Sequence, residues 1–196
     1  MSSDFVSSSA ALKEWAISAE SLAQGRQILL LRKGGLHDED GVFHLEHDSF
    51  YLMPTWFHQE RSLVKPGHQD LWHKTPRQSD EGPKLAYLRH FARAEAVWQL
   101  HETAESALKH ACHIYSPSYL DLRFSYQSNK PLLCAALRLW TLESPLRYEL
   151  RPEDLGCKSW VEWSEPLKTK ATPALSDELF ALKLQELSDV LAPVVA

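Results

Sequence analysis

Apolar and polar positions near the start of the chain predict a helix preceded by a flexible tail. Residues 12–23 carry apolar side chains at spacings of three and four, which is typical of an amphipathic helix, and Gly25 suits its end. The members of this stripe are Leu12, Trp15, Ala16, Ala19, Leu22 and Ala23. The Ser-rich residues before the stripe break the pattern, so residues 1–9 are expected to be a disordered tail.

The stretch from residue 26 to residue 59 predicts a β-hairpin with a long charged tip. Residues 27–31 form an apolar run that is too short for a helix and is followed at once by two basic residues and two glycines. Residues 50–53 are aromatic and apolar, and Pro54 ends this run because proline has no amide hydrogen to donate to a neighbouring strand. The polar residues 37–41 are expected to form the tip.

The second half of the chain predicts further strands and helices. Residues 85–100 alternate between apolar and polar side chains, which favours a strand, although their alanines also suit a helix. Residues 103–113 predict one middle helix, and Ser116 followed by Pro117 predicts the cap and first residue of a second. Three shorter strands and a last amphipathic helix are expected at residues 132–142, 146–150, 158–163 and 176–191.

Together these elements predict an α+β fold. We expect a small, mostly antiparallel sheet with an N-terminal amphipathic helix, two middle helices and a C-terminal helix. A single domain is expected over residues 10–167, followed by a linker and the last helix over residues 168–196. Residues 61–84 are polar, rich in proline and glycine and without periodicity, so they predict a long loop that is either disordered or functional. Leu71 and Trp72 in the middle of these residues indicate a segment that docks on another surface.

Composition narrows the classes of function. The chain has 196 residues, of which 44% are apolar, enough for a sizeable core. A net charge of −5 argues against coating nucleic acid or an anionic membrane by bulk charge, although a local basic face can still bind phosphate. The three cysteines have neither disulfide nor zinc-site spacing, and no apolar run approaches the roughly 18 residues of a membrane helix. We therefore expect a cytoplasmic protein with no membrane association.

Four short motifs occur in order along the chain. They are Leu-Leu-Leu-Arg-Lys-Gly-Gly at residues 29–35, YLMPTWFHQ at residues 51–59, Arg123-Phe124-x-Tyr126, and Ser159-Trp160-Val161-Glu162. Over about residues 10–167 the chain resembles a bacterial family known only as domain-of-unknown-function family 1802. The resemblance implies no activity, because the family has none established. Some members are joined to a restriction-endonuclease-like domain, so it implies an association with DNA-cleavage or defence systems.

Common catalytic signatures are absent from the sequence. No Glu-x-Lys motif of a restriction-type nuclease occurs, and no phosphate-binding loop, nucleophile elbow or His-Glu-x-x-His pair is present. Six of the ten histidines lie within 37 residues, but His44 and His47 would point to opposite faces of a strand. We therefore favour exposed polar histidines over a metal site and expect neither a metal nor a cofactor. The six are His37, His44, His47, His58, His68 and His73.

The protein is accordingly expected to fold without metal. A chelator should leave its melting temperature unchanged, because neither cysteines nor histidines have the spacing of a structural site. Thermal unfolding with and without chelator measures this. A large drop that zinc restores would instead favour a metal-dependent hydrolase built on the histidine-rich hairpin.

Basic and aromatic residues supply the candidates for ligand binding. A Lys-Gly-Gly turn leaves amides uncovered that can cradle a phosphate, and neighbouring aromatic rings can stack on bases. The ligand-binding candidates are Arg32, Lys33, Gly34, His58, Gln59, Arg89, Arg93, Arg123 and Tyr126, and the stacking candidates are Trp56 and Trp72.

The sequence thus favours a non-catalytic binding or accessory module with nucleic acid as the candidate partner. Two alternatives stay open, the metal-dependent hydrolase and a protein-interaction module that docks through the segment around Trp72. Clustering of the basic candidates on one face would favour nucleic acid. Oligomeric state and ligand identity are left open by the sequence.

Overall fold

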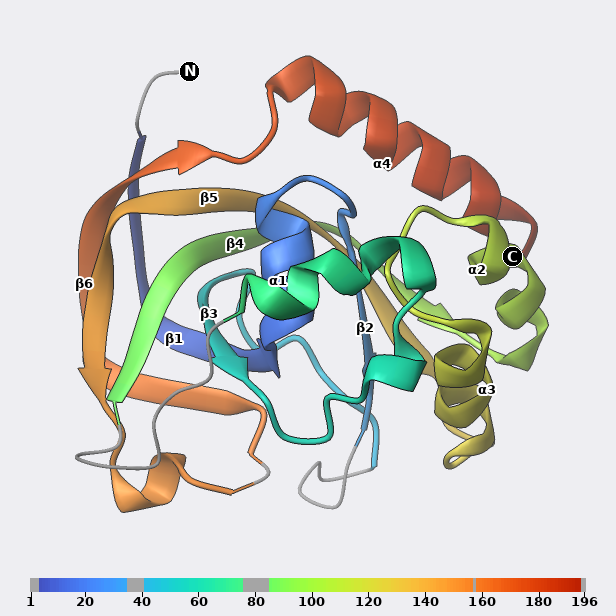
Figure 1. The fold of residues 1–196 in the computed structure, drawn as a ribbon, viewed down its shortest axis with the longest axis horizontal. Coiled ribbons are helices and arrows are strands. Elements are labelled where there is room, and N and C mark those ends of the chain that lie inside the picture. The colour runs from blue at the N-terminus through green and yellow to red at the C-terminus, as the bar shows by residue number, and fades with distance from the viewer. Residues whose placement is uncertain (1–3, 35–40, 76–84, 157, 195–196) are drawn as a thin grey trace.

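A computed structural model describes residues 4–34, 41–75, 85–156 and 158–194. Within these residues, six strands form one mixed sheet against which helices pack, so the α+β class is confirmed (Figure 1). The strands are β1 (Asp4–Trp15), β2 (Leu29–Lys33), β3 (Ser49–Thr55), β4 (Leu85–Leu100), β5 (Leu132–Glu149) and β6 (Trp160–Pro173). The α-helices are α1 (Ala16–Ala23), α2 (Glu105–His110), α3 (Pro117–Ser125) and α4 (Asp177–Leu191). Short 3₁₀ helices span Arg61–Leu63, Pro66–His73, Glu102–Ala104, Pro152–Asp154 and Ala192–Val194.

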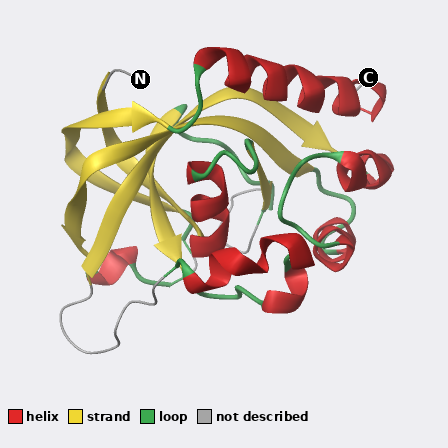
Figure 2. Cartoon of the chain, turned by 45° about the horizontal axis from the view of Figure 1, so that its top comes forward, coloured by secondary structure: helices red, strands yellow, loops and turns green. Residues whose placement is uncertain are grey.

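The sheet closes into a ring. Its strand order is β2-β5-β4-β3-β1-β6, and β6 pairs again with β5, so five strands form the ring and β2 lies outside it (Figure 2). Strands β1 and β3 run parallel, whereas the other pairings are antiparallel. The β4–β5 ladder shifts register between Leu88 and His90 and between Ala94 and Ala96, and such bulges bend long strands. The expectation of a small, mostly antiparallel sheet is therefore corrected to a six-stranded mixed one.

Three apolar clusters hold these layers together. One contains residues from all five ring strands, among them Tyr51, Phe91 and Trp140. A second joins α1 to the sheet through Leu22. The third packs α2, α3 and α4 against β2, with Leu29 among its members. Burial of apolar side chains on several sides explains why many strands lack a simple alternating pattern.

Several elements match their predictions. Strand β4 covers the residues for which alternation was preferred over the alanine-based helix. The Ser116 hydroxyl accepts a hydrogen bond from the Tyr119 amide, and Pro117 is the first residue of α3. In α4, the Ser176 hydroxyl accepts from the amide of Leu179. Capping chemistry depends on a few adjacent residues, so the sequence predicts it well.

The predicted N-terminal helix is wrong in its first half. Residues from Asp4 onward, which include most of the expected tail, form β1, and the helix begins only at Ala16. Strand β1 lies between β3 and β6. Ala11 and Leu12 are both fully buried, one in the ring cluster and the other under α1. With both faces buried, the apolar positions lose the alternation of a strand and imitate a helical stripe.

The predicted hairpin is also wrong. Strand β2 pairs with β5, where Leu29 faces Ala136, and β3 pairs with β1 and β4. Two apolar runs separated by a turn are typical of a hairpin, but the pattern does not show which strand each run chooses. In the structure the partner of β2 is the long strand β5. The expected tip at residues 37–41 lies mostly outside the described residues.

Two further boundaries differ from expectation. Residues 132–142 and 146–150, predicted as separate runs, belong to one strand, because the bulge opposite Arg89 accommodates Pro145. Strand β6 starts at Trp160 and continues through Pro173, so the residues expected as a linker pair with β1 and β5 instead.

The segment that was expected to be an irregular loop is anchored over its first half. Leu71 is fully buried in the cluster that joins α2, α3 and α4, and Val64 bridges to Tyr115. Arg26 and Asp70 add a two-pronged ion pair at 2.6 and 2.7 Å. Residues 76–84 lie outside the described residues. Residues 61–75 are thus a docked part of the fold.

Candidate functional site

Arg32, Glu14 and Arg123 form a charged group at the junction of β1, β2 and α3, called here the arginine cluster. The Arg32 guanidinium donates to the Glu14 carboxylate at 3.3 Å, to the carbonyl of Lys13 at 3.1 Å and to the Ser159 hydroxyl at 2.7 Å. Strands β2 and β6 are the two ends of the strand order. The Arg32 side chain therefore connects β2 to the end of β1 and to the residue just before β6.

The carboxylate of this cluster is buried. Glu14 is only 5% exposed, and burial raises its pKa, while Arg32 and the Trp15 amide oppose the shift. Arg123 attracts the same carboxylate, and its guanidinium lies 4.9 Å from the ring centre of Tyr119. Both arginines are only partly buried. Arg32 pairs with the buried carboxylate and Arg123 attracts it, so the cluster carries a net positive charge on two partly buried arginines.

The start of α1 lies beside this cluster. The Glu14 carboxylate accepts from the amide of Trp15 at 2.7 Å, and the Gln59 side chain accepts from the amide of Ile17 at 3.0 Å. Helix starts carry amides without partners inside the helix, so both contacts satisfy donors that would otherwise be unpaired. Gln59 was predicted as a ligand-binding residue, and it serves here as a cap for α1.

An aromatic loop borders the same region. Residues 56–60, called here the β3 loop, follow Thr55, which pairs with Trp15 at the end of β1. Phe57 is 81% exposed, the largest exposed fraction among the large apolar side chains described. Trp56 is half-buried, and its indole N–H is buried without a partner among the described residues. His58 is exposed, with a left-handed backbone at φ 57°.

The predicted phosphate turn is only partly described, and its described residues are occupied. Lys33 is buried and donates to the Lys130 carbonyl at 2.6 Å, and burial lowers its pKa. A Cβ at Gly34 would lie 2.0 Å from the carbonyl oxygen of Gly41. Glycine is therefore required at position 34 by the close approach of another backbone segment. The rest of the turn lies outside the described residues.

The remaining candidates lie apart from the arginine cluster. Arg93 is paired with Glu95 at 2.7 Å, and none of the contacts among described residues links it to Arg32 or Arg123. Arg89 is exposed on β4. Trp72 packs partly buried against the helical core, which removes one of its faces from stacking. Tyr126 is 44% exposed at the end of α3.

Sequence reasoning brought some of these residues forward but missed the centre of the site. Of the basic candidates, Arg32 and Arg123 lie near one carboxylate, whereas Lys33 and Arg89 lie elsewhere. That carboxylate, Glu14, was not among the sequence candidates. The signal that points to it is a lone carboxylate within the apolar stretch from Ala10 to Ile17. Lys13 is the other charged residue of this stretch, and a carboxylate buried there requires a partner, since burying an unpaired charge is costly.

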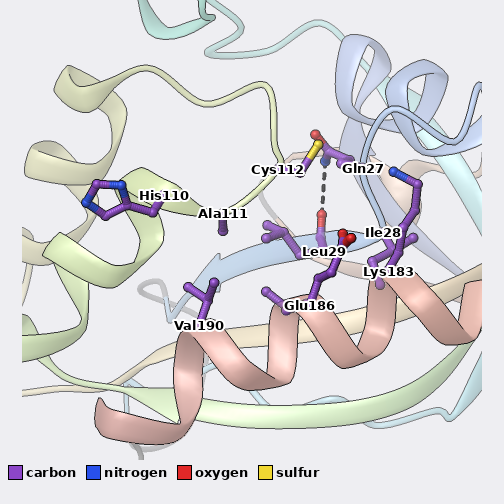
Figure 3. Close-up of a pocket in the computed structure, with 10 residues that line it drawn as sticks. Gln27, Ile28, Leu29, His110, Ala111, Cys112, Lys183, Glu186 and Val190 are labelled. Atoms are coloured by element: carbon purple, nitrogen blue, oxygen red, sulfur yellow. Dashed lines mark hydrogen bonds between the residues drawn. The ribbon is translucent and has the colours of Figure 1, made fainter.

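A separate hollow of about 240 Å³ lies along the outer edge of β2 beneath α4 (Figure 3). Ile28, Leu187, Lys183 and Cys112 are among the residues that line it. The Gln27 side chain donates to the Leu29 carbonyl at 2.9 Å, which covers an edge carbonyl that the sheet leaves free. None of the ligand-binding candidates from the sequence lines this hollow.

A family model described as "Domain of unknown function (DUF1802)" matches residues 11–186, so the chain belongs to this family. This confirms the resemblance carried by the four motifs. No curated protein sequence matches the chain.

The solved structures that match the chain include the crystal structure of ASCH from Zymomonas mobilis. It is 13% identical with a TM-score of 0.40, and the match covers 91% of this chain and 94% of that chain. A point mutant of the same protein from that organism matches at 12% identity and a TM-score of 0.41, with the same two coverages. Similarity at this level indicates nothing about function.

Within the described residues, no helix combines the length and apolar character needed to cross a membrane.

Proposed function

We propose that this protein binds single-stranded nucleic acid at the surface formed by the arginine cluster and the β3 loop. The supporting observation is that Arg32 pairs with a buried carboxylate that also attracts the partly exposed Arg123, near a loop whose Phe57 is 81% exposed. Guanidinium groups bind phosphate oxygens through paired N–H donors. An exposed aromatic ring offers a base a stacking surface that tolerates any sequence.

Single strands fit this surface better than duplexes. In a duplex the bases are already stacked on one another, whereas an unpaired base can turn outward onto Phe57. Few cations are available at the site, because Glu14 offsets one of the two arginines and the chain has a net charge of −5. The proposal therefore expects modest affinity and a shallow dependence on salt, with a slope of about −1 to −2 in log affinity against log salt.

Replacing Phe57 by alanine should weaken binding to a fluorescent oligo-uridine by about 1–3 kcal/mol without changing the salt slope. The ring is mostly exposed, so its removal leaves the fold intact, and stacking releases no counterions. Fluorescence anisotropy at several salt concentrations measures both quantities. Arg123→Gln should instead reduce the slope by about 0.7, since one fewer phosphate is neutralised.

Phe5→Ala is the matched control. Phe5 is 65% exposed and lies on β1 with the ammonium groups of Lys168 and Lys170 near its ring, at 4.9 and 5.7 Å. It is therefore a second exposed ring beside cations, in a different part of the molecule. Loss of binding in F5A but not in F57A would move the site to the β1–β6 surface and contradict the proposal. No binding to any single- or double-stranded oligonucleotide at low salt would reject nucleic acid as the ligand.

A further inference from the structure

A second group of side chains, independent of the arginine cluster, has the composition of a metal site. Glu46, His47 and Glu162 place a potential ligand atom each within 4.8 Å of the other two. His47 Nε2 and Glu162 Oε1 lie 2.7 Å apart. We propose that these three residues bind a divalent transition-metal ion of the Zn²⁺ type. The inference does not depend on nucleic-acid binding.

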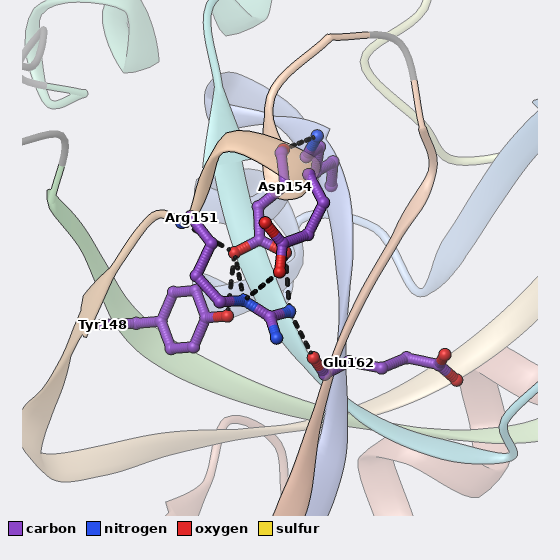
Figure 4. Close-up of polar contacts among 6 residues, drawn as sticks. Tyr148, Arg151, Asp154 and Glu162 are labelled. Atoms are coloured by element: carbon purple, nitrogen blue, oxygen red, sulfur yellow. Dashed lines mark hydrogen bonds and ion pairs between the residues drawn. The ribbon is translucent and has the colours of Figure 1, made fainter.

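The backbone around Glu162 is fixed by a neighbouring polar network. Arg151 donates to the Glu162 carbonyl at 2.7 Å, and the same guanidinium is held by Asp154 at 2.8 and 3.0 Å (Figure 4). Tyr148 donates to Asp154 at 2.9 Å. In Figure 4 the carboxylate of Glu162 points away from Arg151. The network thus positions the main chain at Glu162 and leaves its carboxylate available.

The imidazole of His47 is also held in place. Its ring meets Trp160 edge-on, with the ring centres 5.1 Å apart. Trp160 in turn packs against Phe43 and Phe50. Trp160 and Glu162 are two residues apart on β6, so their side chains lie on the same face of the sheet. An imidazole fixed by packing loses little freedom when it binds an ion, which favours a preformed site.

The charges of the group call for a cation. Two carboxylates lie close together, and within the described residues no lysine or arginine comes within 4.0 Å of either one. A bound metal ion would offset this repulsion. One imidazole with two carboxylates suits zinc and other first-row ions better than magnesium or calcium, which prefer oxygen ligands alone. Three protein ligands leave a coordination position open for water.

The site is compatible with a protein that folds without metal. His47 and Glu162 keep 29% and 58% of their side chains exposed, and neither belongs to the apolar clusters. Removing the ion therefore leaves the core intact, so the expected insensitivity of the melting temperature to chelator still applies. The site instead predicts that adding metal raises the melting temperature.

Titration of metal-free protein with Zn²⁺ tests the proposal. One ion should bind per chain and raise the melting temperature, because an ion that binds only the folded chain stabilises it. Co²⁺ should give a visible absorption band that reports its ligands. His47→Gln and Glu162→Gln should each weaken Zn²⁺ binding at least tenfold, the effect typical of losing a ligand or its supporting group.

His101→Gln serves as the control, because His101 is an exposed histidine on a different segment. It should bind Zn²⁺ as the wild type does, and so should Phe57→Ala, which separates this proposal from the nucleic-acid one. Unchanged Zn²⁺ affinity in H47Q would overturn the proposal. Failure of the wild type to bind either ion would also overturn it.

Discussion

Replacing Arg32 by alanine is expected to lower the free energy of unfolding by about 3 kcal/mol. Breaking a buried ion pair by removing one partner costs about 3–5 kcal/mol, because the other charge stays buried without compensation. The lower end of this range applies, since the Arg32 side chain is 20% exposed while that of Glu14 is 6% exposed. The variant also loses the hydrogen bonds to Lys13 and Ser159 that connect β2 with β1 and β6. Urea unfolding measures the change.

The loss should depend on pH in a defined direction. Burial raises the pKa of Glu14 above its ordinary value of 4.5, and Arg32 is the strongest of the groups that oppose the shift. Without Arg32 the pKa in the folded state rises further. A carboxyl whose pKa is higher when folded favours the native state below its unfolded pKa, and this contribution is lost as pH rises through the folded pKa. The gap between wild type and R32A should therefore be larger at about pH 8 than at about pH 5.

A double variant separates charge from packing. Adding Glu14→Gln to Arg32→Ala removes the buried charge and keeps an oxygen that accepts from the Trp15 amide. The double variant should therefore be more stable than R32A alone near neutral pH. Equal stability of the two, with no dependence on pH, would mean that Arg32 acts only through its bonds to Lys13 and Ser159.

The parts of the fold that the sequence predicts are those that depend on neighbouring residues. The cap at Ser116 and the alternation in β4 are local features, and each is confirmed. Strand pairing depends on distant segments. The partner of β2 begins about a hundred residues later, at Leu132, and no local pattern encodes that choice. The ring itself depends on the pairing of β5 with β6, which bulges and bends make possible.

The candidate site shows the same division between local features, which the sequence predicts, and long-range contacts, which it does not. Arg32 and Arg123 could be chosen as candidates from residue type alone, but their meeting at Glu14 requires the closure of β2 against β1 and β6. Lysine is a common phosphate ligand, yet Lys33 is buried and its ammonium group already donates to the Lys130 carbonyl. Residue type predicts chemistry. Only the fold decides which charges remain available to a ligand.

Leu71→Ala is expected to destabilise the protein by about 2–5 kcal/mol, the range for removing a buried leucine side chain and leaving a cavity. Leu71 is fully buried among residues of the helical core, although it lies in a segment whose sequence is typical of a loop. The spread reflects how far the surroundings can collapse into the vacated space. Because Leu71 is the one buried residue of the 3₁₀ helix Pro66–His73, removing its side chain should also loosen residues 61–75 from the core. Urea unfolding and hydrogen exchange across the segment measure the two effects.

Leu182→Ala is the matched control, because Leu182 is 56% exposed on α4 and alanine is the better helix former. Its free energy of unfolding should stay within about 0.5 kcal/mol of wild type. If L71A were as stable as L182A, and if amides around Leu71 in the wild type exchanged freely, the segment would open independently of the sheet. In solution the segment would then be the loop that its prolines and glycines predict, and it would not be docked on the core. Slow exchange at Leu71 in the wild type, lost selectively in L71A, is the outcome that burial predicts.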